Sequence, residues 1–391
     1  MIEANRRLLG RLIVAMLSLT ALPAWPQPCY RVTPILPPSP KQGIVMPIAL
    51  NDRGEVTGGL RTQRDIIFVW SEQDGMHALP ILPRGNDSFG CYAHAINNAG
   101  QVVGNCGVAV QGDVQHGLSV LENDPRGTPS DGWSINFAGK IVGHRAALNG
   151  GYEAFLYDSC CGMHALMPHD PEASVFASFI NASGLVIGFD STHHVPFVWS
   201  PDYGVRYLDA AADTGERAYA SALNDSGIVL LDVWREVITT ADDPRRVDYG
   251  QGFDHLTPEG VAAEAARPPF RIERHAYLYD IGSGQRSPIG HLPGGDEYTR
   301  GLQINRHREV VGESGASDNA MRAFYWHPYT GMLQVDQLID RRDPYDGIAF
   351  HSALGINDVG QILAISTDGK PFLLTPVETG ECPVHRTSSN K

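Results

Sequence analysis

One short pattern recurs seven times along the chain and constrains its fold more than any other feature. Each copy has an apolar residue, Asn, two variable residues, Gly and a further apolar run. Asn opens tight turns by bonding its own backbone, and Gly supplies the positive φ that precedes a second strand. Each copy therefore predicts a β-hairpin, although Arg308 stands in place of the Gly in the sixth. The repeat asparagines are Asn51, Asn97, Asn136, Asn181, Asn224, Asn305 and Asn357.

The hairpin belongs to a longer unit. Six copies have a small residue four positions before the Asn, which predicts close packing of the inner strands: Ala93, Gly132, Ala177, Ala220, Gly301 and Ala353. An apolar, often aromatic strand follows the hairpin, as at 155–157, although the second unit offers only the weaker 118–120. Such a strand, apolar on both faces, is typical of a sheet between two other sheets. A polar turn and a short fourth strand complete the unit.

The spacing of the units predicts an all-β protein, a seven-bladed β-propeller of four-stranded blades over residues 27–380. The asparagines step by 46, 39, 45, 43, 81 and 52 residues, and most of these steps match one propeller blade. The step of 81 is one blade plus an insertion, which we place at 231–274 in blade five. The last unit ends at its third strand, and residues 30–36 resemble a fourth. The N-terminal strand is therefore expected to close the ring and remove an open sheet edge.

The chain has six cysteines, an even number that favours an oxidising compartment. Ring closure brings Cys29 near Cys382, and Cys91 and Cys106 flank one predicted hairpin. Cys160 and Cys161 are adjacent and are candidates for a vicinal disulfide, with a reactive thiol as the alternative. The spacing of these cysteines fits no zinc motif.

The N-terminal segment 1–26 is predicted to be a signal peptide. It carries Arg6, Arg7 and Arg11 before an apolar stretch that is short for a membrane span, although a membrane anchor is the alternative. The other end, 381–391, is a mostly polar tail. We therefore expect an exported protein, periplasmic or extracellular, with no transmembrane anchor in the mature chain.

Charge and motifs exclude several classes of function. The net charge is −14, and an acidic surface repels nucleic-acid phosphates, so we expect no nucleic-acid partner. The sequence has no nucleophile elbow, no HExxH pattern, no phosphate-binding loop and no EF-hand loop. It therefore predicts no cofactor, no metal and no identified catalytic residue.

At the level of its repeats, the chain resembles the bacterial extracellular HAF-repeat family, named after the tripeptide His-Ala-Phe. The tripeptide reads Glu153-Ala154-Phe155, Arg322-Ala323-Phe324 and His275-Ala276-Tyr277, and Gly290-His291-Leu292-Pro293-Gly294-Gly295 approximates a second motif of that family. The resemblance covers nearly all of residues 30–376. It implies an exported repeat fold, and it brings no activity and no catalytic residues.

The predicted topology places the Asn turns on one face of the ring, and the links between second and third strands and between blades on the other. Those links differ in length, and we call their side the variable face. They are expected at 83–92, 105–116, 144–152, 168–176, 210–219, 231–274, 293–300 and 338–350. Variable loops over a rigid scaffold are typical of a binding face. The candidate ligand-binding residues, at the predicted starts of inner strands, are Tyr92, His94, Tyr298, Arg300 and His351. The alternative is that they only satisfy strand ends.

Three functions remain open at this point. The first is an exported binding or interaction scaffold whose variable face takes a protein, a peptide or a glycan. The second is an envelope hydrolase or lyase with its site at the central channel. The third is a structural envelope protein with no small ligand.

Overall fold

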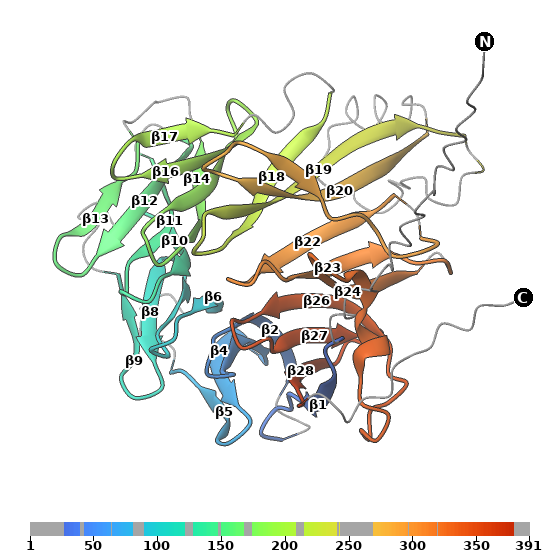
Figure 1. Ribbon diagram of the computed structural model, residues 1–391. Helices are drawn as coiled ribbons and strands as arrows, with labels where there is room; N and C mark the ends of the chain where they lie inside the picture. Colours follow the sequence, from blue (N-terminus) through green and yellow to red (C-terminus); the bar gives the residue numbers. More distant parts are fainter. Residues whose placement is uncertain are drawn as a thin grey trace, which may run out of the picture.

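The computed structural model contains seven four-stranded antiparallel sheets arranged as blades around a central channel (Figure 1). The predicted all-β, seven-bladed β-propeller is confirmed. The residues that the structure describes are 27–39, 43–63, 65–80, 90–121, 128–147, 150–167, 174–208, 215–240, 242, 269–295, 297–318 and 320–378. The predicted signal peptide and the C-terminal tail lie outside them.

The first four blades follow the chain from the inner strand outward. Blade one consists of β2 Ile44–Leu50, β3 Val56–Arg61, β4 Asp65–Ser71 and β5 Gly75–Ala78. Blade two consists of β6 Tyr92–Ile96, β7 Val102–Asn105, β8 Ala109–Asp113 and β9 Gly117–Val120. Blade three consists of β10 Ser130–Ile135, β11 Ile141–Ala146, β12 Tyr152–Asp158 and β13 Gly162–Ala165. Blade four consists of β14 Val175–Ile180, β15 Val186–Asp190, β16 Val195–Ser200 and β17 Gly204–Tyr207.

The last three blades contain the longest strands and the ring closure. Blade five consists of β18 Arg217–Leu223, β19 Ile228–Ile238, β20 Phe270–Asp280 and β21 Arg286–Pro288. Blade six consists of β22 Thr299–Ile304, β23 Val310–Gly315, β24 Met321–His327 and β25 Gly331–Gln334, and a 3-10 helix, η2 Val335–Leu338, follows it. Blade seven consists of β26 Phe350–Ile356, β27 Ile362–Ser366, β28 Pro371–Pro376 and β1 Tyr30–Pro34.

The N-terminal strand closes the ring as predicted. β1 is the outermost strand of blade seven and pairs antiparallel with β28 from Tyr30 opposite Pro376 to Pro34 opposite Phe372. The backbone N–H of Val377 also donates to the carbonyl of Cys29 at 2.8 Å. In this blade, built from both ends of the chain, β1 covers the edge of β28 that would otherwise be open.

Three sequence expectations need correction. Residues 118–120 belong to β9, the fourth strand of blade two, and the third strand is β8, which carries no aromatic residue. The predicted insertion 231–274 begins and ends inside strands, because β19 and β20 pair with each other out to Ile238 opposite Phe270. The predicted loop 105–116 contains β8, and its last residues form the β8–β9 turn on the opposite side of the ring.

The seven asparagines do more than open their turns. Each side-chain amide donates a hydrogen bond to the backbone carbonyl of the repeat Asn in the next blade, so that seven bonds close a ring around the channel. The Nδ2–O distances, taken in order from Asn51, are 2.9, 3.0, 3.1, 3.1, 3.1, 3.1 and 2.9 Å, and the last bond returns from Asn357 to Asn51. Each carbonyl Oδ1 accepts N–H groups of its own turn, as Asn97 does from Ala99 and Gln101 at 3.0 Å. We call these seven residues the asparagine ring.

The glycine position of the turn requires a positive φ. Arg308, which replaces the glycine in the sixth copy, adopts φ 64°, one of two non-glycine residues with positive φ among those the structure describes. The fold therefore imposes the left-handed conformation there whatever the residue type, at a cost that glycine avoids.

Each inner strand contains a β-bulge at the same repeat position, immediately after the small residue in six blades and after Pro47 in blade one. In blade three the bulge falls between Gly132 and Ser134, so that Trp133 is the extra residue. A Cβ on Gly132 would lie 2.5 Å from a methyl group of Val103 in blade two, so the position must stay small. The small residue does mark close packing, but its partner is the second strand of the preceding blade and not, as predicted, another inner strand.

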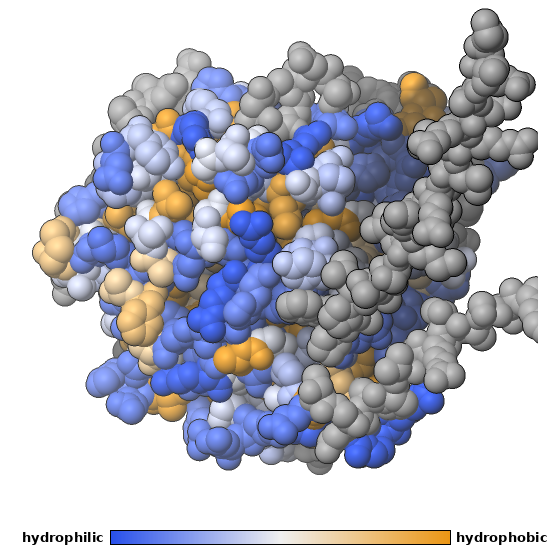
Figure 2. All heavy atoms as spheres, in the orientation of Figure 1, coloured by the Kyte–Doolittle hydropathy of each residue, from blue (hydrophilic) through white to orange (hydrophobic). Residues whose placement is uncertain are grey.

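The hydrophobic core lies between neighbouring blades. Phe155 on β12 packs toward blade two with Val103, whereas Ala154 beside it packs toward blade four with Val175. Both faces of the third strand are thereby buried, which explains its apolar character in the sequence. The face shown in Figure 2 is mainly hydrophilic, with separate small hydrophobic areas.

Candidate functional site

The inner strands surround the channel, and their two ends form two different mouths. At the turn face, the asparagine ring and the apolar residues before it line a cavity of about 200 Å³. At the variable face, the inner strands begin with residues that differ from blade to blade. The residues in the strand position that precedes the small residue are Met46, Tyr92, Asp131, Phe176, Tyr219, Arg300 and Ser352. This second mouth is therefore the part of the channel that can be specific.

Side chains from blades two, three and four form a cluster at this mouth. The rings of His94 and Trp133 stack with centroids 4.4 Å apart and an interplanar angle of 17°. His144 on β11 meets Tyr152 edge-on at 5.2 Å and Phe176 at 4.9 Å, and it lies 6.3 Å from Trp133. We call these five rings the aromatic cluster.

Asp131 adds a carboxylate to the aromatic cluster. Its Oδ1 lies 3.1 Å from Nε2 of His94, yet this contact does not have the geometry of a hydrogen bond. Oδ1 of Asp131 and Nδ1 of His144 are two of only four buried side-chain polar atoms without a hydrogen-bond partner among the described residues. Burial also lowers the pKa of His144. Buried polar atoms are rarely left unpaired, and they often mark sites where a ligand completes the bonding.

A second group lies at blades five and six, on the same side of the ring. Arg274 donates from Nε to Oδ1 of the buried Asp232 at 2.7 Å, and its Nη1 lies 3.2 Å from the Tyr298 hydroxyl. Arg300 lies 4.0 Å from Asp232 and 3.6 Å from Glu313. Burial raises the pKa of Asp232, although the Arg274 guanidinium acts against this shift. We call these five residues the charged cluster. Their hydrogen bonds and ion pairs to one another link blades five and six.

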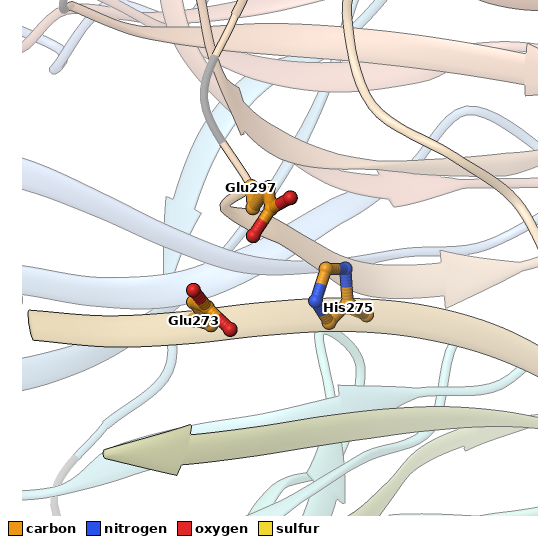
Figure 3. Close-up of side chains that lie close together, drawn as sticks. All are labelled: Glu273, His275 and Glu297. Atoms are coloured by element: carbon orange, nitrogen blue, oxygen red, sulfur yellow. The ribbon is translucent and has the colours of Figure 1, made fainter. Parts of the chain in front are cut away.

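Beside the charged cluster, Glu273, His275 and Glu297 approach one another closely enough to be considered as metal ligands. Glu273 and His275 lie two residues apart on one face of β20, and Glu297 reaches them from the segment before β22 (Figure 3). However, Arg235 donates to one oxygen of Glu273 at 2.7 Å and Arg271 donates to the other at 2.5 Å. A cation would have to compete with two guanidinium groups, so this arrangement fits an ion-pair network better than a metal centre.

The junction between blades seven and one contains an apolar cavity of about 550 Å³ on the variable face. It lies between the ends of β1 and β28 and the start of β2, and Ile35, Leu36, Ile44, Ile348 and Phe372 are among its lining residues. Leu36 and Ile44 are exposed. This cavity gives the variable face an apolar sector in addition to its charged one.

The sequence-predicted residues fall into these groups only in part. His94 belongs to the aromatic cluster, and Tyr298 and Arg300 belong to the charged cluster. Tyr92, at the start of β6, hydrogen-bonds to Asp65 of blade one, and this bond raises the pKa of its hydroxyl. His351 is exposed at the start of β26, within a bulge.

Sequence reasoning missed most of the aromatic cluster. Asp131, Trp133 and Phe176 occupy the same repeat positions as the predicted Tyr92 and His94, five or three residues before the repeat Asn. Applying that register to every blade would have found them. His144 and Tyr152 lie on the second and third strands, where no such signal marks them.

The predicted disulfides are settled for two of the three pairs. Cys91 and Cys106 are bonded, with Cα atoms 4.3 Å apart, and so are the adjacent Cys160 and Cys161. The structure therefore supports the vicinal disulfide over the reactive thiol. The pairing of Cys29 with Cys382 remains a prediction, because Cys382 lies outside the described residues.

Comparisons with known proteins support the fold. No protein-family model matches the sequence, and no curated protein sequence is significantly similar to it. Among solved structures, a streptogramin B lyase matches with a TM-score of 0.52 and 8% identity over 89% of this chain and 98% of the lyase. YCF48, solved bound to a D1 peptide, matches with a TM-score of 0.52 and 13% identity over 93% of this chain and 100% of that one. At these identities the matches show a shared propeller fold.

Proposed function

We propose that this chain is an exported scaffold that binds a peptide segment of a partner protein at the variable-face mouth of its channel. The observation that carries this proposal is the exposure of large aromatic side chains around that mouth. Tyr92, Trp133 and Tyr152 are 43%, 39% and 42% exposed. Tyr, Trp and Arg dominate the binding energy of protein interfaces, because they offer large rigid surfaces with a polar group.

The architecture supports a binding role at this end of the channel. The asparagine ring fixes the inner strands at the other end, so the mouth residues project from a rigid frame. A mouth whose residues differ from blade to blade suits recognition of an asymmetric ligand such as a peptide. The peptide named in the YCF48 structure indicates that a propeller of this general form can hold one.

Export is the second part of the proposal. The charged and apolar segment at 1–26 has the composition of a signal peptide, and the Cys91–Cys106 disulfide is stable in an oxidising compartment. The resemblance to HAF-repeat proteins points the same way. Among the described residues, no helix is long and apolar enough to cross a membrane. Secretion measured with a reporter fused after residue 26 tests this part.

Selection from a displayed library of random peptides tests the binding function directly. The selected peptides are expected to bind the wild-type protein and to lose at least about tenfold in affinity for Trp133→Ala. Phe137→Ala is the matched control, because Phe137 is a 70% exposed aromatic four residues further along the same blade, at the turn-face mouth. Equal losses for the two variants, or no selected peptide at all, would exclude the variable-face mouth as the binding site.

The two alternatives from the sequence stay predictions. An envelope hydrolase or lyase requires an acid–base group at the channel, and His94 beside Asp131 is the pair of that chemical type at the mouth. A structural envelope protein requires no ligand, so a binding-competent mouth counts against it.

A further inference from the structure

We propose that the aromatic cluster, together with Asp131, forms a subsite for the cationic end of a lysine or arginine side chain of the bound peptide. This inference rests on the proposed function and specifies the chemistry of one position in the partner. Its components come from three successive blades, so the subsite exists only in the assembled ring.

The first argument concerns the aromatic faces. A cation is attracted to the face of an aromatic ring, most strongly to Trp, within about 6 Å of the ring centre. His94 covers one face of Trp133 at 4.4 Å, yet Trp133 remains substantially exposed. Tyr152 and Phe176, with centroids 5.3 Å apart, continue the aromatic surface beside it. A side chain that enters here meets several rings while its methylene stem is also buried.

The second argument concerns the unpaired acceptors. Asp131 and His144 are Cα partners across β10 and β11, so their side chains leave the same face of the sheet. Both carry a buried atom that lacks a hydrogen bond. A buried acceptor without a donor costs about 1–3 kcal/mol. An ammonium or guanidinium group supplies N–H donors together with the charge that a carboxylate prefers.

The third argument concerns the surrounding charge. The nearest arginine along the strand, Arg145, is paired with Glu153 in a short contact and is only 12% exposed, so its charge is already matched. His144 is held toward its neutral form by burial, which leaves a ring nitrogen able to accept. The protein as a whole is acidic, and this attracts cations to the surface. In the charged cluster, by contrast, Arg274 already occupies the carboxylate of Asp232.

The experiment compares two pentapeptides that differ only in charge. The probes are acetyl-Gly-Gly-Lys-Gly-Gly-amide and the same peptide with norleucine, which keeps the four-carbon stem without the ammonium group. Binding to the full-length protein is followed by NMR, through ligand saturation transfer and the shifts of labelled histidine rings. The lysine peptide is expected to bind about tenfold more tightly and to shift His94 and His144.

Two variants locate the effect. Asp131→Asn keeps the size of the side chain and removes its charge, and it should remove most of the preference for lysine over norleucine. Asp225→Asn, which removes an exposed carboxylate from the turn face, should leave the preference intact. Trp133→Leu should weaken both probes, and thermal melting establishes that each variant is folded.

The outcomes separate this inference from the function on which it rests. Equal binding of the two probes, no detectable binding of either, or an unchanged preference in Asp131→Asn would each overturn the cationic subsite. Peptides from the library selection could still bind the mouth in any of these cases, and the proposed function would then stand without it.

Discussion

The two mouths of the channel are built on the same seven strands and differ in almost every other respect. At the turn face, seven asparagines repeat one hydrogen-bond pattern, and every side-chain amide has its partner in the next blade. At the variable face, the residue type changes from blade to blade, and three buried polar atoms, on Asp131, His144 and Ser352, have no hydrogen-bond partner. The fold itself satisfies the polar groups of the first mouth, whereas the second mouth keeps buried polar atoms that have no hydrogen bond. Stability and binding are therefore expected to separate between the two ends of the same strands.

Breaking the asparagine ring should have the largest effect. Asn224→Ala removes the donor to Asn305 and the acceptor of two N–H groups of its own turn. Three buried bonds at about 1 kcal/mol each predict a loss of about 3 kcal/mol in the free energy of unfolding. Chemical denaturation measures it. Ser226→Ala, an exposed position in the same turn, is the control and should change stability little. A similar loss of stability in both variants would show that the asparagine ring stabilises the protein no more than an exposed turn residue does.

Removal of the disulfide beside the variable-face mouth should have the second largest effect on stability. Replacing Cys91 and Cys106 with serine opens a loop of 15 residues, for which the entropic estimate is at most about 3 kcal/mol. Replacing Cys160 and Cys161 removes a bond between adjacent residues, which closes no comparable loop. The melting temperature should therefore fall for the first pair and hardly move for the second. Equal shifts would contradict the loop-closure explanation.

A fall in pH should reduce the contribution of the aromatic cluster to stability more than that of the asparagine ring. Burial lowers the pKa of His144 in the folded protein, while the unfolded chain keeps a value of about 6.5. As the pH falls through about 6.5, the unfolded state takes up the proton first, so the stability that the neutral His144 contributes is lost. His144→Gln should make the unfolding free energy less dependent on pH between 7 and 5. An unchanged slope would show that His144 does not titrate differently in the two states.

The smallest expected effect is an increase in the free energy of unfolding, whereas the changes above decrease it. Arg308 holds a positive φ at the position where the other turns have glycine. Arg308→Gly should relieve this strain and stabilise the protein by about 0.5 kcal/mol, after the entropic cost of a glycine in the unfolded chain. Gly227→Ala, at the same position of blade five, should destabilise it. If Arg308→Gly does not stabilise the protein and Gly227→Ala does not destabilise it, the turn does not require the left-handed conformation.

Most of the fold could be predicted because its signal is local. A turn residue, a glycine and a small residue recur within ten positions of one another, and each acts on the backbone nearby. The errors arose where that signal weakened. The third strand of blade two carries no aromatic residue, so residues 118–120 took its place in the prediction. In blade five, β19 and β20 are longer than the other strands, and their outer parts are largely exposed and polar, so the sequence assigned them to an insertion.

The candidate site could be predicted only where it shares the register of the repeat. His94 and Arg300 were found because inner strands begin at the variable face. The sequence did not point to His144 and Tyr152, because they join the cluster only through ring contacts that form when the blades pack together.

The sequence by itself determined the number of blades, the closing strand and the position of each turn. Those features depend on φ preferences and on hydrophobic runs that act over a few residues. Only the tertiary structure decided that the turn asparagines bond to one another and that Asp131 lies among rings from three blades. The asparagine bonds join residues 39 to 81 positions apart, and 306 positions apart where the ring closes. The sequence does not encode such pairings as a pattern, because the closed ring, and not any single blade, brings the partners together.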